Sequence, residues 1–173
     1  MRENDITKEA GLALQYALFA GLAGGLAEIL WIALYTSLTS GSGVEVARQV
    51  TVTLFPSAAA LPAAPLIGIA IHLALSAALA VVFVRVVWIP FANRMAGSAS
   101  VIIAVTALIA IWGINFFVIL PAVNPSFATL MPYGITLISK VLFGAAMAWS
   151  LRKSIAPCRA RSPDENVVGI YNF

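Results

Sequence analysis

The sequence predicts an all-α integral membrane protein, a bundle of four transmembrane helices with both termini in the cytoplasm. Hydrophobic residues make up 61% of the 173-residue chain and charged residues only 10%, whereas soluble domains carry about 25% charged residues. Charged residues are also absent between Arg48 and Arg85 and between Arg94 and Lys140. Both stretches exceed the roughly 20 apolar residues that cross the hydrocarbon core of a bilayer.

Turn residues and charges divide the apolar sequence into four expected spans. The first ends at the turn sequence 40–43 (Ser-Gly-Ser-Gly), the second at Pro90, the third at Pro121 and the fourth at the basic pair 152–153. Glycine favours turns, and proline interrupts a continuing helix. The expected spans cover about residues 11–38, 65–89, 99–120 and 131–151. Together they form one transmembrane domain, residues 1–155, and the mixture of proline, serine and charge in 156–173 predicts a disordered cytoplasmic tail.

The connector after the first span contains an apolar segment, Val44 to Phe55, that is too short to cross a bilayer. We expect a helix lying on the outer membrane surface. A partly re-entrant segment is an alternative. The alternation of valine and leucine with threonine over 50–54 also fits a short strand.

Basic residues predict the orientation of the bundle. They cluster at the amino terminus, in the connector between the second and third spans, and after the fourth span, whereas the other two connectors hold only Arg48. Basic loops stay on the cytoplasmic side, so both termini are expected there. A shift of 68 positions also places His72 over Lys140 and Arg85 over Lys153, which suggests a repeat of two parallel hairpins.

Glu28, His72 and Lys140 are ionisable side chains that lie deep within the expected spans. At a rise of 1.5 Å per residue they lie about 10–15 Å from the outer ends of their spans, and Asn115 lies about 8 Å from the outer end of the third. A charge at the bilayer centre costs about 2.5–3.5 kcal/mol. We therefore expect these four residues to form one intramembrane polar cluster.

Small residues accompany each ionisable residue at helical spacing, which indicates that the charges face neighbouring helices. Membrane helices approach closely along such ridges of small residues. The expected helix-packing residues are Gly21, Gly24, Gly25, Gly68, Ser76 and Gly144.

The cluster is compatible with several roles. A Glu28–Lys140 ion pair could fix the helix register, with His72 and Asn115 completing its hydrogen bonds. A carboxylate, an imidazole and an amine in contact could also exchange protons. A lone His72 could hold haem from one side, but one histidine and one glutamate are too few ligands for a closed metal site. We expect no metal and no obligatory cofactor.

No phosphate-binding loop, nucleophile elbow or paired-histidine motif is present, so we expect a non-enzyme. The basic residues flank apolar segments, so they indicate membrane topology and not nucleic-acid binding. The expected partners are the lipid bilayer and either another membrane protein or further copies of the chain. The predicted function is an accessory, assembly or interaction subunit of a membrane complex, and the alternative is a small oligomeric transporter or a proton or ion channel.

Two segments resemble the YagU-type family of small bacterial inner-membrane proteins. They are His72-x-x-x-Ser76-x-x-x-Ala80 after a proline-rich loop, and Phe116-x-x-x-Leu120-Pro121 before the last span and its basic end. The resemblance covers about half of the chain, and Lys140 departs from the acidic residue or histidine common in the last span of such families. It implies a four-span protein of the bacterial inner membrane and names no substrate.

Overall fold

The computed structural model describes residues 3–88 and 98–160, with the helical backbone alone for 3–10 and 153–160. The described residues form helices and no strand, which confirms the all-α prediction. Four helical stretches within them are long and apolar enough to cross a membrane, which confirms the four predicted spans. The helices are α1 (Glu3–Ser37), α2 (Gly43–Leu54), η1 (Pro56–Ala58), α3 (Ala64–Phe83), η2 (Val84–Trp88), α4 (Ala99–Ile114), η4 (Asn115–Ile119), α5 (Leu120–Val123), α6 (Pro125–Leu130) and α7 (Tyr133–Ala160).

The spans lie close to their expected positions, and two helices run past their expected ends. The third span continues beyond Pro121 to Val123, because Pro121 lies in the first turn of α5, where its missing N–H is not needed. Helix α7 continues to Ala160, so residues 156–160 of the expected disordered tail are helical. The basic pair at 152–153 ends the apolar span, but arginine and lysine are good helix formers and do not end the helix. The rest of the expected tail, 161–173, lies outside the described residues.

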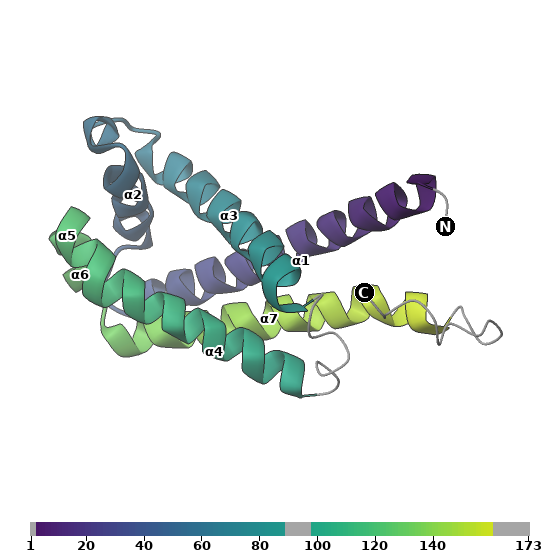
Figure 1. Ribbon diagram of the computed structural model, residues 1–173. Coiled ribbons are helices and arrows are strands. Elements are labelled where there is room, and N and C mark those ends of the chain that lie inside the picture. Colours follow the sequence, from purple (N-terminus) through teal and green to yellow (C-terminus); the bar gives the residue numbers. More distant parts are fainter. Residues whose placement is uncertain (1–2, 89–97, 161–173) are drawn as a thin grey trace.

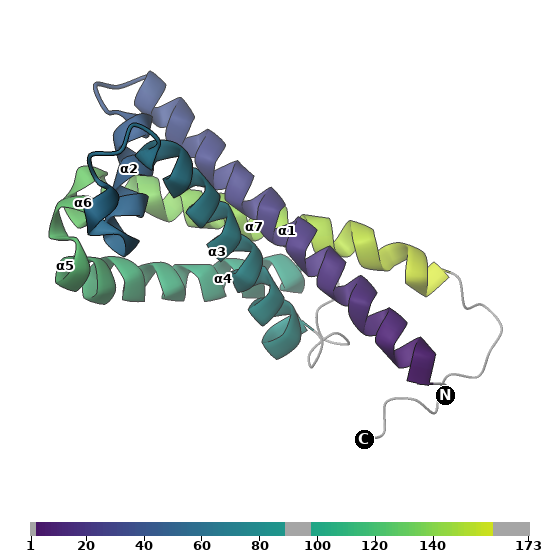
Figure 2. The same cartoon turned by 90° about the horizontal axis from the view of Figure 1, so that it is seen from above.

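Helices α1 and α7 pack against each other at the centre of the structure (Figure 1). Helix α3 packs on α1, and α4 packs on α7, whereas α3 and α4 are not a packed pair in the described structure. In Figures 1 and 2 these two helices converge where the chain leaves η2 and enters α4, and diverge toward α2, α5 and α6. We call the first end of the bundle the narrow end and the second the wide end.

An apolar core joins all four spans at the narrow end. It includes Ala17 of α1, Phe83 of α3, Leu108 of α4 and Met147 of α7, all of them buried. Trp88 of η2 belongs to the same cluster. The helices are therefore in side-chain contact at this end even though α3 and α4 separate further along.

Small residues allow the helices to come close. A Cβ atom added at Gly21 of α1 would lie 2.5 Å from the carbonyl oxygen of Ser76 in α3, and one added at Gly24 would lie 2.8 Å from the Phe143 ring of α7. Gly25 meets the Ser76 side chain in the same way. The structure thus places Gly21, Gly24, Gly25 and Ser76 where α1 meets its two neighbours. Gly144 of α7 lies against Val105 of α4.

The segment after the first span is helical, so the strand alternative for it is wrong. Helix α2 begins after Ser42, whose side chain accepts a hydrogen bond from the backbone N–H of Glu45. It crosses the start of α3 so closely that a Cβ atom added at Gly68 would meet the carbonyl oxygen of Ala47. The buried Thr51 hydroxyl donates to the carbonyl of Ala64 at 2.6 Å. Helix α2 is thereby fixed to α3 at the wide end.

Candidate functional site

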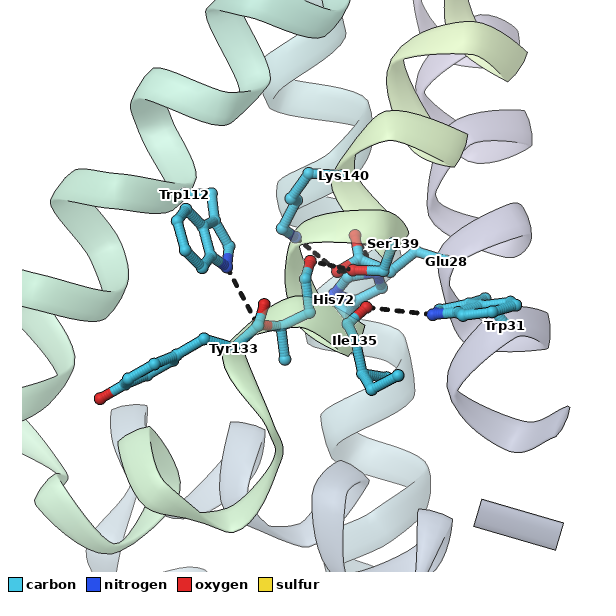
Figure 3. A network of polar contacts seen from close by, with 9 residues as sticks. Glu28, Trp31, His72, Trp112, Tyr133, Ile135, Ser139 and Lys140 are labelled. Atoms are coloured by element: carbon cyan, nitrogen blue, oxygen red, sulfur yellow. Dashed lines mark hydrogen bonds and ion pairs between the residues drawn. The ribbon is translucent and has the colours of Figure 1, made fainter. Parts of the chain in front are cut away.

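The structure brings three of the four predicted cluster residues together. Glu28 of α1 accepts hydrogen bonds at Oε1 from Lys140 Nζ of α7 at 2.5 Å and from Ser139 Oγ at 2.9 Å. Its other oxygen, Oε2, lies 3.7 Å from His72 Nε2 of α3. Figure 3 shows these side chains converging on the Glu28 carboxylate. One carboxylate therefore connects three membrane-spanning helices.

The small residues of α1 explain why this convergence is possible. Gly24 lies one turn before Glu28 and contacts α7, and Gly25 contacts α3 beside Ser76. With no Cβ in the way, both neighbouring helices approach the α1 backbone closely enough for short side-chain contacts to Glu28. The same ridge that packs the helices therefore positions the charges.

The cluster is only partly shielded. Glu28 is 8% exposed and Ser139 is completely buried, whereas the His72 and Lys140 side chains are 23% and 20% exposed. A lysine facing hydrocarbon is costly. Water or another protein surface beside this exposed edge would lower that cost.

Two buried atoms of the cluster have no hydrogen-bond partner, namely Glu28 Oε2 and His72 Nε2. Their separation of 3.7 Å is longer than a hydrogen bond. It is also too short for a bridging water, which needs about 4.5 Å between the two atoms that it joins. The two atoms face each other directly, so they lack only a proton and a small closing movement to form a bond.

Asn115 does not join the cluster, so this part of the prediction is wrong. It is the first residue of η4, next to α4, and α4 packs on α7 and is not packed on α1 or α3. Trp112 of α4 meets Thr136 and Val105 meets Gly144, so Asn115 lies about two helical turns from Lys140, toward the wide end. The hydroxyl of Ser139 supplies the hydrogen bond that was expected from Asn115. Nothing in the sequence distinguishes Ser139 from other serines, apart from its position next to Lys140.

Two tryptophans support α7 beside the cluster. Trp31 Nε1 of α1 donates to the carbonyl of Ile135, and Trp112 Nε1 of α4 donates to Thr136 Oγ1, each at 3.0 Å (Figure 3). The Trp112 ring also packs edge-on against Tyr133. The first turns of α7 are therefore held from both sides, which fixes the position of Lys140.

A second polar network, which the sequence did not predict either, lies at the wide end. The buried Asn124 donates from Nδ2 to Gln49 Oε1 and to Thr53 Oγ1 of α2, both at 3.0 Å. Its Oδ1 accepts from Ser126 Oγ and from the backbone N–H of Phe127, at the start of α6. One asparagine thus joins α2 to the connector before α7. Asparagine before a proline predicts a turn, but the partners 71 and 75 positions away could not be read from it.

The environment of His72 bears on the possibility of haem binding. His72 Nε2 is buried against Glu28, so this nitrogen is not open to a haem iron. Among the residues whose side chains the structure describes, 11–88 and 98–152, no three His, Cys, Asp or Glu side chains gather into a possible metal site.

Comparison with protein-family models, with curated proteins and with solved structures finds no match. The resemblance to YagU-type proteins stays a prediction. Function is therefore argued from the site alone.

Proposed function

We propose that this protein is a non-catalytic, multi-pass interaction subunit of a complex in the bacterial inner membrane, with both termini in the cytoplasm. The observation that carries the proposal is the exposed edge of the cluster. His72 and Lys140 keep about a fifth of their side chains uncovered inside spanning helices. A partner helix on the side where α3 and α4 do not pack would cover them.

Other features support the same proposal. The described connectors are short, and Asn124 bonds α2 to the start of α6, so little of the described chain remains for a catalytic domain. The basic amino terminus and basic carboxyl-terminal segment favour a cytoplasmic location for both ends.

Site-specific photocrosslinking in native nanodiscs tests this function. A photoreactive residue replaces Leu75 of α3, which is 56% exposed, one turn from His72. The control replaces Leu30 of α1, which is 68% exposed and lies about 200° around the helix from Glu28. We expect a protein adduct of one defined mass at Leu75 and none at Leu30. A single-copy assembly in which Leu75 labels only lipid would contradict the proposal.

A second candidate function is a small oligomeric transporter or a proton or ion channel that uses Glu28, His72 and Lys140. Contact between a carboxylate, an imidazole and an amine inside the membrane supports it. The test is pH-dependent flux into proteoliposomes. Flux that is lost in His72→Ala and Glu28→Gln would favour this candidate, and absence of flux in the wild type would exclude it.

A further inference from the structure

We propose that His72 Nε2 and Glu28 Oε2 form a binding site for a single proton inside the membrane, and that this proton makes or breaks a bond between α3 and α1. The site goes beyond the function proposed above, because it exists within one chain whether or not a partner is present.

The first step concerns the unpartnered pair itself. Both atoms are buried and face each other at 3.7 Å without a hydrogen bond. A carboxylate oxygen is an acceptor, and an imidazole nitrogen without hydrogen is also an acceptor. With no proton between them, two lone pairs oppose each other in a dry environment. With one proton, the same two atoms form a charge-assisted hydrogen bond, which is shorter and stronger than a neutral one.

The second step concerns the hydrogen of the neutral imidazole. A neutral ring carries one hydrogen, on Nδ1 or on Nε2. A hydrogen on Nε2 would be donated to Glu28 Oε2, but these two atoms are 3.7 Å apart and have no hydrogen bond. We therefore assign the hydrogen of the neutral ring to Nδ1. Nε2 is then bare, and it gains a hydrogen only when the ring takes up a second proton.

The third step concerns the carboxylate. Glu28 Oε1 already accepts from Lys140 Nζ and Ser139 Oγ, so the carboxylate cannot turn away from His72 without breaking both bonds. Lys140 and Glu28 are the charged groups that face His72. The charged residues of α2, Glu45 and Arg48, form an ion pair with each other, and Arg48 also donates a hydrogen bond to the carbonyl oxygen of Ala59. Oε2 is therefore held in place as a fixed acceptor.

These contacts favour a proton that is stored and not passed along a chain. Oε1 of Glu28 accepts only from Lys140 and Ser139 among the described residues. In the described part of the chain, no further titratable side chain continues a path from His72 or Glu28. Proton uptake from the solvent forms one N–H bond on His72, and release of the proton to the solvent breaks it. The result is a bond between α3 and α1 that is present or absent according to pH.

Nitrogen-15 NMR of the whole protein in nanodiscs tests this site directly. His72 is the single histidine of the chain, so protein labelled with 15N-histidine and purified without a histidine tag gives one pair of ring signals. We expect Nε2 to pass from a bare to a protonated, hydrogen-bonded signal as the pH falls through the range from about 8 to about 5. The other ring nitrogen is expected to stay protonated throughout.

Two variants make the test specific. Glu28→Gln removes the fixed charged acceptor, so Nε2 should lose its proton at a pH at which the wild type retains it. Asn115→Leu, a matched change in a polar residue outside the cluster, should leave the titration unchanged. If Glu28→Gln does not fold, the hydrogen-bonded Nε2 signal of the wild type decides by itself. The proposal is overturned if Nε2 stays bare over the whole range, or if Glu28→Gln titrates like the wild type.

Discussion

The two ends of the bundle are held together by different forces. At the narrow end, the four spans share an apolar core that includes Phe83, Leu108 and Met147. At the wide end, where α3 and α4 diverge, a smaller apolar cluster around Trp112 and Phe116 is supplemented by polar connections, namely the Glu28–Lys140 pair and the Asn124 network. Lipid is as apolar as leucine, so membrane helices associate through close packing and hydrogen bonds and not through a hydrophobic drive. The Glu28–Lys140 pair and the Asn124 network thus connect helices at the end where α3 and α4 separate.

The largest effect is expected from breaking the Glu28–Lys140 pair. Lys140→Met leaves the buried carboxylate without its counter-charge and should lower the free energy of unfolding by about 3–5 kcal/mol. The double variant Glu28→Gln with Lys140→Met should recover most of this loss, because no buried charge remains. Detergent-induced unfolding, followed by tryptophan fluorescence, measures the free energy of unfolding of the wild type, the Lys140→Met variant and the double variant.

An exposed pair provides the control for this prediction. Glu45 and Arg48 of α2 are 3.3 Å apart, with side chains 40% and 31% exposed. Glu45→Gln should therefore change stability by less than about 1 kcal/mol. An equal loss in Glu45→Gln and Lys140→Met would show that burial does not distinguish the two pairs.

An intermediate effect is expected from Gly68→Ala, which acts on the wide end through packing alone. The added methyl group would lie 1.8 Å from the carbonyl oxygen of Ala47, so α2 and α3 must move apart. Overpacking of this kind costs about 1–3 kcal/mol. The measurement is the same unfolding assay, with protease sensitivity of α2 as a second readout.

Gly113→Ala is the matched change, since nothing lies within 4 Å of a Cβ atom there. Alanine is the better helix former by about 0.8–1.0 kcal/mol, so this variant should be as stable as the wild type or more stable. A loss of stability in Gly113→Ala, or none in Gly68→Ala, would contradict the contact between α2 and α3.

The smallest effect is expected from Asn124→Ala. It removes the hydrogen bonds to Gln49 and Thr53 and should cost about 1 kcal/mol. Hydrogen–deuterium exchange should rise in α2 and α6 and remain unchanged in α7. Ser126→Ala removes only an exposed hydroxyl that donates to Asn124, and exchange in α2 should stay as in the wild type.

Hydropathy predicted the spans well because crossing a bilayer requires a long apolar segment regardless of what that segment packs against. The structure reproduces the four spans to within a few residues. The predicted end of the third span at Pro121 was too early. Sequence alone does not show whether a proline lies in the first turn of a new helix or ends the old one. The orientation and the hairpin repeat stay predictions.

Three members of the site were predictable from the sequence and the fourth was not. Counting residues placed Glu28, His72 and Lys140 at compatible depths, and their contact follows from the small residues beside them. The same counting placed Asn115 with them, but α4 packs on α7 in a register in which Trp112 meets Thr136, and Asn115 lies further toward the wide end. Helix α4 is packed on α7 and not on α1 or α3, and this arrangement depends on tertiary packing that no local pattern encodes.

The separation of Glu28 and Lys140 along the chain has a consequence for biosynthesis. The partners are 112 positions apart, on the first and last spans. At about 5–20 residues per second, the ribosome needs roughly 6–22 s to make Lys140 after Glu28. During this interval the first span bears its carboxylate in the translocation channel or the bilayer without its final counter-charge. His72 is made 44 positions after Glu28 and is the earliest cluster residue that can meet it. The His72 imidazole can therefore contact the Glu28 carboxylate before Lys140 has been made.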